Sequence, residues 1–210
     1  MFITYILVGM LRSRNPDETR DCLLDAAMQE IHLHGFQGAS LKRILEDTGF
    51  TKGALYHHFP TKQALGYAVV EERLTAMIRA LWIDPLKEYK DPITGLMEVT
   101  KQAKDEMGEL TLLKLGCPLN NIAQEMSSLD EGFRHRIYDV YMLWHKSIVE
   151  ALVRGQGAGI VREDIDCDSA AMFIVASIEG AVGIAKTAQK DEILSQCMHA
   201  AFEYLQQLRA

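Results

Sequence analysis

Cysteine, proline and long apolar runs are all scarce in this sequence. Its 210 residues include only four cysteines, which lie far apart without a CxxC pair, and five prolines. This spacing indicates neither a zinc knuckle nor a secreted disulfide framework, and it fits a reducing cytoplasm. Because 48% of the residues are apolar and 24% are charged, disorder and low-complexity architecture are excluded. We expect a soluble globular protein with no metal site and no cofactor.

The apolar run at residues 2–11 is too short to span a bilayer. Arg12 and Arg14 follow this run instead of preceding it, and no small-residue cleavage site appears, so a signal peptide is not indicated. We therefore expect either that residues 1–14 form an N-terminal arm or that translation starts at Met10, and we expect no membrane partner.

The net charge of −7 is distributed unevenly. In residues 1–66 seven basic and seven acidic residues cancel, whereas residues 67–210 carry the whole acidic excess. Within residues 36–66 four Lys and Arg residues face two acidic residues. This local positive charge is suited to contact with a polyanion.

Apolar residues recur at three- to four-residue spacing, and no stretch alternates as a strand does, so the sequence predicts an all-α fold of about nine helices. Asn15 and Pro16 start the first helix, which Gly35 ends. Ser128 with Glu131 predicts a capping box before a long helix. The remaining predicted helices cover about residues 41–48, 52–58, 62–81, 91–108, 118–126, 167–187 and 191–208.

Residues 36–65 contain two short helices joined by a tight turn, the dimensions of a helix-turn-helix. Ser40 and Thr51 are the predicted N-caps, and Gly49 supplies the left-handed backbone of the turn. The start of the second helix offers unpaired N–H groups and a positive dipole end, to which phosphate can bind. An ordinary helical hairpin has the same dimensions, so geometry alone leaves both interpretations open.

If this segment binds DNA, the second helix enters the major groove and the surrounding polar side chains contact phosphate. Gly53 lets the backbone approach closely, and Lys62 provides a second anchor on the next helix. The candidate DNA-binding residues are Ser40, Lys42, Arg43, Thr51, Lys52, Gly53, Tyr56, His57 and Lys62.

The run from Gly49 to Leu65 reads Gly-x-x-x-Gly-x-Leu-Tyr-x-His-Phe-x-x-Lys-x-x-Leu. This pattern closely resembles the N-terminal domain of TetR/AcrR-family transcriptional repressors, and the resemblance covers about residues 15–66. It implies a three-helix helix-turn-helix domain at 15–60 and a helical effector-binding and dimerisation domain at 61–210. It also implies a cytoplasmic repressor that binds double-stranded DNA at a palindromic operator and is released by a small-molecule effector.

The segment Ile178–Lys186 resembles the penultimate helix of this family, which usually forms part of a dimer interface. Small residues such as Gly180 and Gly183 allow two helices to approach closely. The last predicted helix, with Leu194, Cys197 and Ala201, would complete a four-helix contact across a two-fold axis. We therefore expect a homodimer through about residues 167–208.

Apolar and polar side chains of the second domain are candidates for an effector pocket. The residues we select are Cys117, Asn121, Met126, Tyr138, Met142, His145 and Phe173. Cys117 also lies at a predicted helix start, where the positive dipole end can lower a thiol pKa. A redox- or electrophile-sensing regulator acting through Cys117 is therefore an alternative, as is a small buried residue with no reactivity.

Two other classes of protein are weighed against the regulator. An enzyme that uses Cys117 with His145 is disfavoured, because no nucleophile elbow, glycine-rich phosphate loop or carboxylate cluster is present. A helical adaptor without DNA affinity would show no salt-sensitive, two-fold-symmetric footprint on DNA. The sequence therefore favours a DNA-binding transcriptional regulator that is not an enzyme.

Overall fold

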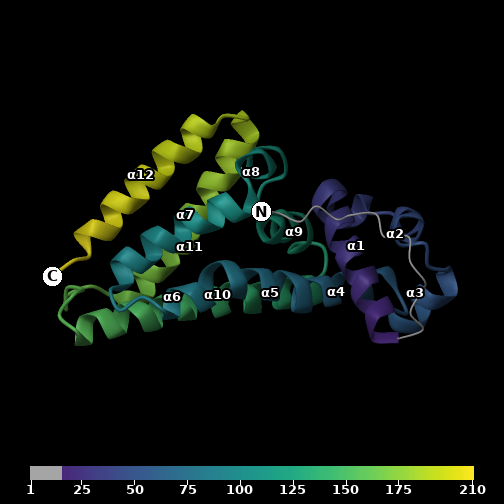
Figure 1. Ribbon diagram of the computed structural model, residues 1–210, viewed down its shortest axis with the longest axis horizontal. Coiled ribbons are helices and arrows are strands. Elements are labelled where there is room, and N and C mark those ends of the chain that lie inside the picture. Colours follow the sequence, from purple (N-terminus) through teal and green to yellow (C-terminus); the bar gives the residue numbers. More distant parts are fainter. Residues whose placement is uncertain (1–15) are drawn as a thin grey trace.

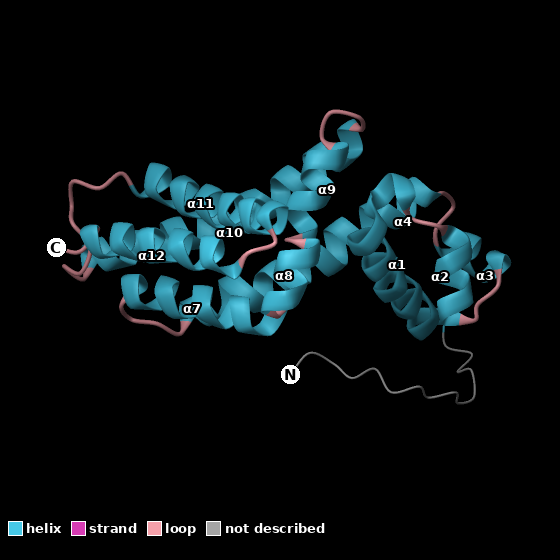
Figure 2. Cartoon of the chain, turned by 90° about the horizontal axis from the view of Figure 1, so that it is seen from above, coloured by secondary structure: helices cyan, strands magenta, loops and turns pink. Residues whose placement is uncertain are grey.

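The computed structural model describes residues 16–210, and the regular structure of that range is helical apart from an isolated bridge between Val161 and Arg209 (Figure 1). The predicted all-α class is confirmed. The predicted arm at residues 1–14 lies outside the described residues. Figure 2 places α1–α4 at one end of the molecule and α7, α10, α11 and α12 at the other.

The helices have the following bounds. The N-terminal domain contains α1 (Pro16–Gly38), α2 (Leu41–Thr48) and α3 (Lys52–His58). The connecting helix is built from α4 (Lys62–Ala68), α5 (Thr75–Ile78) and α6 (Asp84–Lys87), with π-helical turns at Val69–Leu74 and Arg79–Ile83. The remaining helices are α7 (Pro92–Met107), α8 (Glu109–Leu115), α9 (Pro118–Met126), α10 (Glu131–Gly157), α11 (Cys167–Ala188) and α12 (Asp191–Gln207).

The N-terminal domain is held by one apolar face of α1. Leu23, Leu24 and Ala27 on this face are fully buried, together with Ile44 of α2 and Leu55 of α3. A helix as short as α3 is unstable alone, so the burial of Leu55 stabilises it against its neighbours. The fold of this domain therefore follows from short-range caps and one shared core.

The predicted end of the first helix at Gly35 is confirmed. Gly35 has φ 73° and ψ 166°, and a single further turn to Gly38 follows this kink. The predicted long linking helix also forms: every junction between Lys62 and Glu88 keeps right-handed helical φ and ψ. A continuous helix therefore runs from the N-terminal domain into the C-terminal domain.

Two local features of the C-terminal domain differ from the sequence expectations. The N-cap of α10 is Asp130, whose side chain accepts a hydrogen bond from the Phe133 N–H at 2.9 Å, so the capping box predicted at Ser128 is wrong. Asp130 also accepts from the Tyr67 hydroxyl at 2.7 Å, a contact that sequence spacing does not reveal. The short helix α8 was not predicted.

Helix α11 is the most apolar helix of the domain. Within residues 16–210 it alone has the length and hydropathy to cross a membrane, and 44% of its apolar window is buried inside the protomer. It packs against α8, α10 and α12 (Figure 1). Core packing therefore accounts for much of its apolar composition.

Candidate nucleic-acid interface and effector pocket

The turn between α2 and α3 has the geometry that its sequence predicts. Gly49 adopts φ 68° and ψ 12°, and its N–H donates to the Leu45 carbonyl at 2.8 Å. Ser40 caps α2, and the Thr51 hydroxyl caps α3 by accepting from the Ala54 N–H at 3.2 Å. The N-terminal turn of α3 is therefore rigidly positioned beside α2.

Five candidate DNA contacts lie exposed on α3 and at its N-cap. They are Thr51, Lys52, Gly53, Tyr56 and His57. Tyr56 is 49% exposed although it is a large aromatic residue. A Cβ on Gly53 would meet only the Thr51 hydroxyl, at 3.8 Å, so the space above the start of α3 is open. This exposed group presents N–H donors, an ammonium, a phenol and an imidazole in one place.

The candidates on α2 differ from one another. Lys42 is exposed and lies 3.5 Å from Glu46. Arg43 is half-exposed, and its Nε donates to the buried Glu30 carboxylate at 2.7 Å. Glu30 also accepts from the Ser40 N–H at 2.8 Å. Burial acts to raise the pKa of Glu30, but the hydrogen bonds from Arg43 and Ser40 lower it overall. Arg43 therefore fastens α2 to α1 in this structure.

Lys62 is partly buried between α4 and the end of α1. Its Nζ donates to the Gln37 carbonyl at 3.0 Å and lies 5.0 Å from the centroid of the Phe36 ring. Burial lowers the pKa of Lys62. An ammonium has three donors, so one contact to a carbonyl leaves others for a phosphate oxygen.

A carboxylate of the C-terminal domain binds the end of α1. Glu125 of α9 accepts hydrogen bonds from the Phe36 N–H at 2.7 Å and the Gln37 N–H at 2.8 Å. These donors face Glu125 because Gly35 breaks the helix before them. A Cβ at Gly35 would lie 2.8 Å from Glu125 Oε2, in addition to the strain at positive φ. The interdomain contact therefore depends on glycine at this position.

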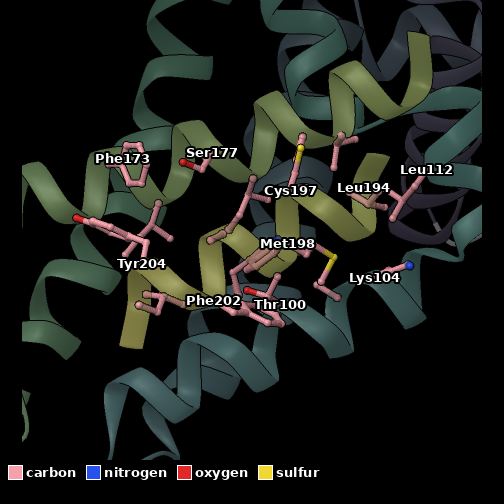
Figure 3. Close-up of a pocket in the computed structure, with 18 of the residues that line it drawn as sticks. Thr100, Lys104, Leu112, Phe173, Ser177, Leu194, Cys197, Met198, Phe202 and Tyr204 are labelled. Carbon is pink, nitrogen blue, oxygen red and sulfur yellow. The ribbon is translucent and has the colours of Figure 1, made fainter. Parts of the chain in front are cut away.

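A pocket of about 680 Å³, partly open to solvent, lies in the C-terminal domain. Its walls come mainly from α7, α11 and α12, with Trp82 from the connecting helix and Leu112 from α8 (Figure 3). Most of this lining is not predicted from the sequence, because the α12 side chains Leu194, Cys197 and Ala201 are expected there to contact a second protomer. The broad apolar face of α12 was the sequence signal that could have indicated this pocket lining.

Of the seven residues selected for the effector pocket, Phe173 alone lines this one. Cys117, Asn121 and Met126 lie on α9 or at its start, and Tyr138, Met142 and His145 lie on α10. Tyr138 is 60% exposed, whereas His145 is buried with Nε2 3.1 Å from the Asp168 carbonyl. The structure therefore does not bring the seven together around one cavity.

Of the two alternatives for Cys117, the structure supports the small buried residue. Cys117 is the N-cap of α9, as predicted, but its Sγ is buried and donates to Glu179 Oε1 at 3.3 Å. Burial and the Glu179 carboxylate raise the pKa of the Cys117 thiol well above its usual value. Because the thiolate is the reactive form, this site does not favour a sensing thiol.

The exposed faces of α11 and α12 differ in polarity. On α11 the exposed residues include Met172, Ala176, Gly180 and Ile184, spaced four apart along one face. The exposed face of α12 is mostly polar. Within the described residues, the apolar surface of the predicted dimer region therefore belongs chiefly to α11.

Together, the capped α2–α3 pair, the exposed start of α3 and the separate helical domain define a helix-turn-helix regulator. A family model described as bacterial regulatory proteins of the tetR family matches residues 23–69. A second, described as a Tetracyclin repressor-like C-terminal domain, matches residues 93–201. The chain belongs to the TetR family of DNA-binding transcriptional regulators, and it is not an enzyme. The predicted family is confirmed.

Individual relatives support the same assignment. The chain is 25% identical over 193 residues to the HTH-type transcriptional repressor DhaR of Mycobacterium sp. strain GP1, covering 89% of this chain and 91% of that protein. It is 28% identical to the transcriptional regulator LmrA of Bacillus subtilis, covering 82% and 88% of the two chains. A TetR transcriptional regulator from Chloroflexus aurantiacus has a TM-score of 0.81 at 26% identity, covering 94% and 98%.

Proposed function

We propose that this protein is a homodimeric, cytoplasmic repressor that binds a palindromic operator through residues 15–60. A small molecule bound by residues 61–210 releases it from DNA. The observation that carries the proposal is the exposed start of α3, where Thr51, Lys52, Gly53 and Tyr56 surround an open helix N-terminus. Helix N-termini bind phosphate, and recognition helices enter the major groove from this end. The name of the relative DhaR, a transcriptional repressor, supports the sign of regulation.

The homodimer is supported by the exposed apolar stripe of α11. Met172 and Ile184 are 45% and 57% exposed, and the small residues Ala176 and Gly180 lie between them. Small residues let two helices approach closely, and a two-fold axis through this stripe would pair each α11 with its copy. Two-fold symmetry would then place the recognition helices about one DNA turn, or a multiple of it, apart.

A chain of contacts supports coupling between the effector pocket and the DNA-binding domain. Leu112 lines the pocket, and its carbonyl accepts from the Gly116 N–H at 2.9 Å. The Gly116 carbonyl lies 2.9 Å from His32 Nε2 of α1, and Glu125 of the adjacent α9 binds the end of α1. A ligand that moves α8 would therefore bias the position of α1. A coupling of about 1–3 kcal/mol would change operator affinity roughly 5- to 150-fold.

The test is a gel shift and footprint on the DNA that flanks the protein's own gene, titrated with salt. We expect a two-fold-symmetric footprint and an affinity that falls as salt rises. Lys52→Ala should weaken binding and flatten the salt dependence, whereas Lys114→Ala, at an exposed lysine of α8, should do neither. A footprint without two-fold symmetry would contradict the dimeric operator model, and equal operator affinity of the two variants would exclude Lys52 as a DNA contact.

A further inference from the structure

We propose that the pocket between α7, α11 and α12 binds an uncharged molecule with a hydrocarbon-rich or aromatic body and one hydrogen-bonding group. That this molecule is the effector rests on the function proposed above. The pocket walls are the first ground for the proposal. Trp82, Phe173 and Phe202 supply aromatic surface, and the other walls are mostly aliphatic or sulfur-containing (Figure 3). Such a wall gains free energy by removing apolar ligand surface from water.

The single charged side chain in the lining is already neutralised. Lys104 places its Nζ 2.9 Å from Asp191 Oδ1 and 3.7 Å from Glu109 Oε2. An anionic ligand would have to compete with two carboxylates for this ammonium. A cationic ligand would find no carboxylate among the lining residues. Because moving a charge out of water without a partner is costly, both kinds of ligand are disfavoured.

The hydroxyl of Ser177 remains for a polar ligand atom. The Thr100 hydroxyl already donates to the Leu96 carbonyl at 2.6 Å. By contrast, the hydroxyls of Ser177 and Tyr204 form none of the hydrogen bonds found among residues 16–210. The Tyr204 ring packs against Phe173 with centroids 4.6 Å apart, and Figure 3 shows its hydroxyl pointing away from Cys197 and Met198. One hydroxyl, carbonyl or uncharged arylamine group of a ligand could therefore be bound without desolvating a charge.

The softness of the pocket agrees with this ligand class. Met107, Met198 and Cys197 line it, and the flexible thioethers of methionine adapt to ligands of different shape. The pocket is therefore expected to select ligands by their polarity and charge more than by their shape.

Two fluorescent probes that share a skeleton test the charge preference. N-phenyl-1-naphthylamine is uncharged, whereas 1-anilinonaphthalene-8-sulfonate carries one added sulfonate. We expect the full-length protein to bind the neutral probe at least about tenfold more tightly than the sulfonate, because only the anion loses hydration without gaining a partner. Equal affinities, or tighter binding of the sulfonate, would overturn the proposed ligand class.

A pair of adjacent alanines tests the location. Ala201 lines the pocket, whereas Ala200, the preceding residue of α12, is exposed and does not line it. Ala201→Phe should reduce binding of the neutral probe by at least about tenfold, and Ala200→Phe should leave it unchanged. Circular dichroism checks folding, and Ala201→Leu replaces Ala201→Phe if the larger side chain unfolds the protein. Unchanged probe binding in a folded Ala201 variant would place the site elsewhere and refute the proposal.

Operator binding separates the ligand class from the regulatory function. If the neutral probe binds as expected and lowers operator affinity, both proposals are supported. If it binds selectively in the pocket but operator affinity does not change, the ligand class holds and the effector role of the pocket fails. If the protein without any probe binds no operator, the proposed regulator function fails while the probe measurements still decide the ligand class.

Discussion

The buried carboxylate of Glu179 is expected to make the stability of the protein depend on pH. Glu179 is only 7% exposed, and its Oε2 has no hydrogen-bond partner. Burial raises its pKa from 4.5 to about 7, although the hydrogen bond from Cys117 acts in the opposite direction. Because the folded protein binds this proton more tightly than the unfolded chain, the stabilisation is complete below about pH 4.5. It is lost as the pH rises toward about 7.

The substitution that isolates this effect is Glu179→Gln. Gln keeps the shape of the side chain but cannot ionise. Each pKa unit corresponds to about 1.4 kcal/mol, so the raised pKa corresponds to about 3 kcal/mol between acidic pH and about pH 8. The stability of Glu179→Gln relative to the natural protein should rise by this order of magnitude over that interval. For a chain of this length, the change is about 6–12 °C in the relative thermal midpoint.

The assay is thermal unfolding followed by circular dichroism at several pH values. The difference between the thermal midpoints of the two proteins at each pH cancels every titration that they share, which leaves the contribution of Glu179. Glu163→Gln, at an exposed position in the loop before α11, is the matched control and should follow the natural protein at each pH. Parallel pH profiles for Glu179→Gln and the natural protein would refute the argument, because they would mean that burial does not hold this carboxyl neutral.

Three further predictions concern the interfaces. A Cβ at Gly180 or at Gly157 meets nothing within 4 Å, so each protomer should fold with arginine at either position. Gly180→Arg should sediment as a monomer and Gly157→Arg as a dimer. An unchanged dimer in both variants would exclude the α11 stripe from the dimer interface. Glu125→Ala should expose the Phe36 and Gln37 amides to faster hydrogen exchange without unfolding α3, and unchanged protection would mean that the carboxylate does not hold this turn. Glu30→Ala should lower the thermal midpoint by several degrees, because it removes the buried partner of Arg43 and of the Ser40 amide; an unchanged midpoint would contradict this.

The helix-turn-helix could be predicted from the sequence because its signals are local. The side chains of Ser40 and Thr51 cap their helices by accepting from N–H groups three residues further along the chain, and Gly49 adopts the left-handed conformation that its position requires. Such interactions depend on neighbouring residues alone, so spacing reveals them. The DNA contacts assigned to these residues stay predictions. The structure adds that Arg43 and Lys62 already have protein partners, Glu30 and the Gln37 carbonyl.

The pocket could not be predicted, because it depends on which helix faces meet. The apolar face of α12 was assigned to a second protomer, but Leu194, Ala201 and Leu205 turn toward α7 and α11 of the same protomer. The apolar periodicity of a helix shows that a face will be buried without naming the partner. The N-cap of α10 is Asp130 instead of Ser128, and Asp130 also binds the hydroxyl of Tyr67, which is 63 residues away in sequence.

The sequence by itself determined the all-helical class, the family and the local geometry of α2 and α3, because periodicity, caps and turn glycines act over a few residues. The tertiary structure alone decided what lies beside each of these elements. Cys117 was correctly placed at a helix start, yet burial and its partner Glu179, 62 residues away in sequence, raise the thiol pKa instead of lowering it. Burial and charge at a site are set by residues from distant helices, and the local sequence does not show which of these residues will pack there.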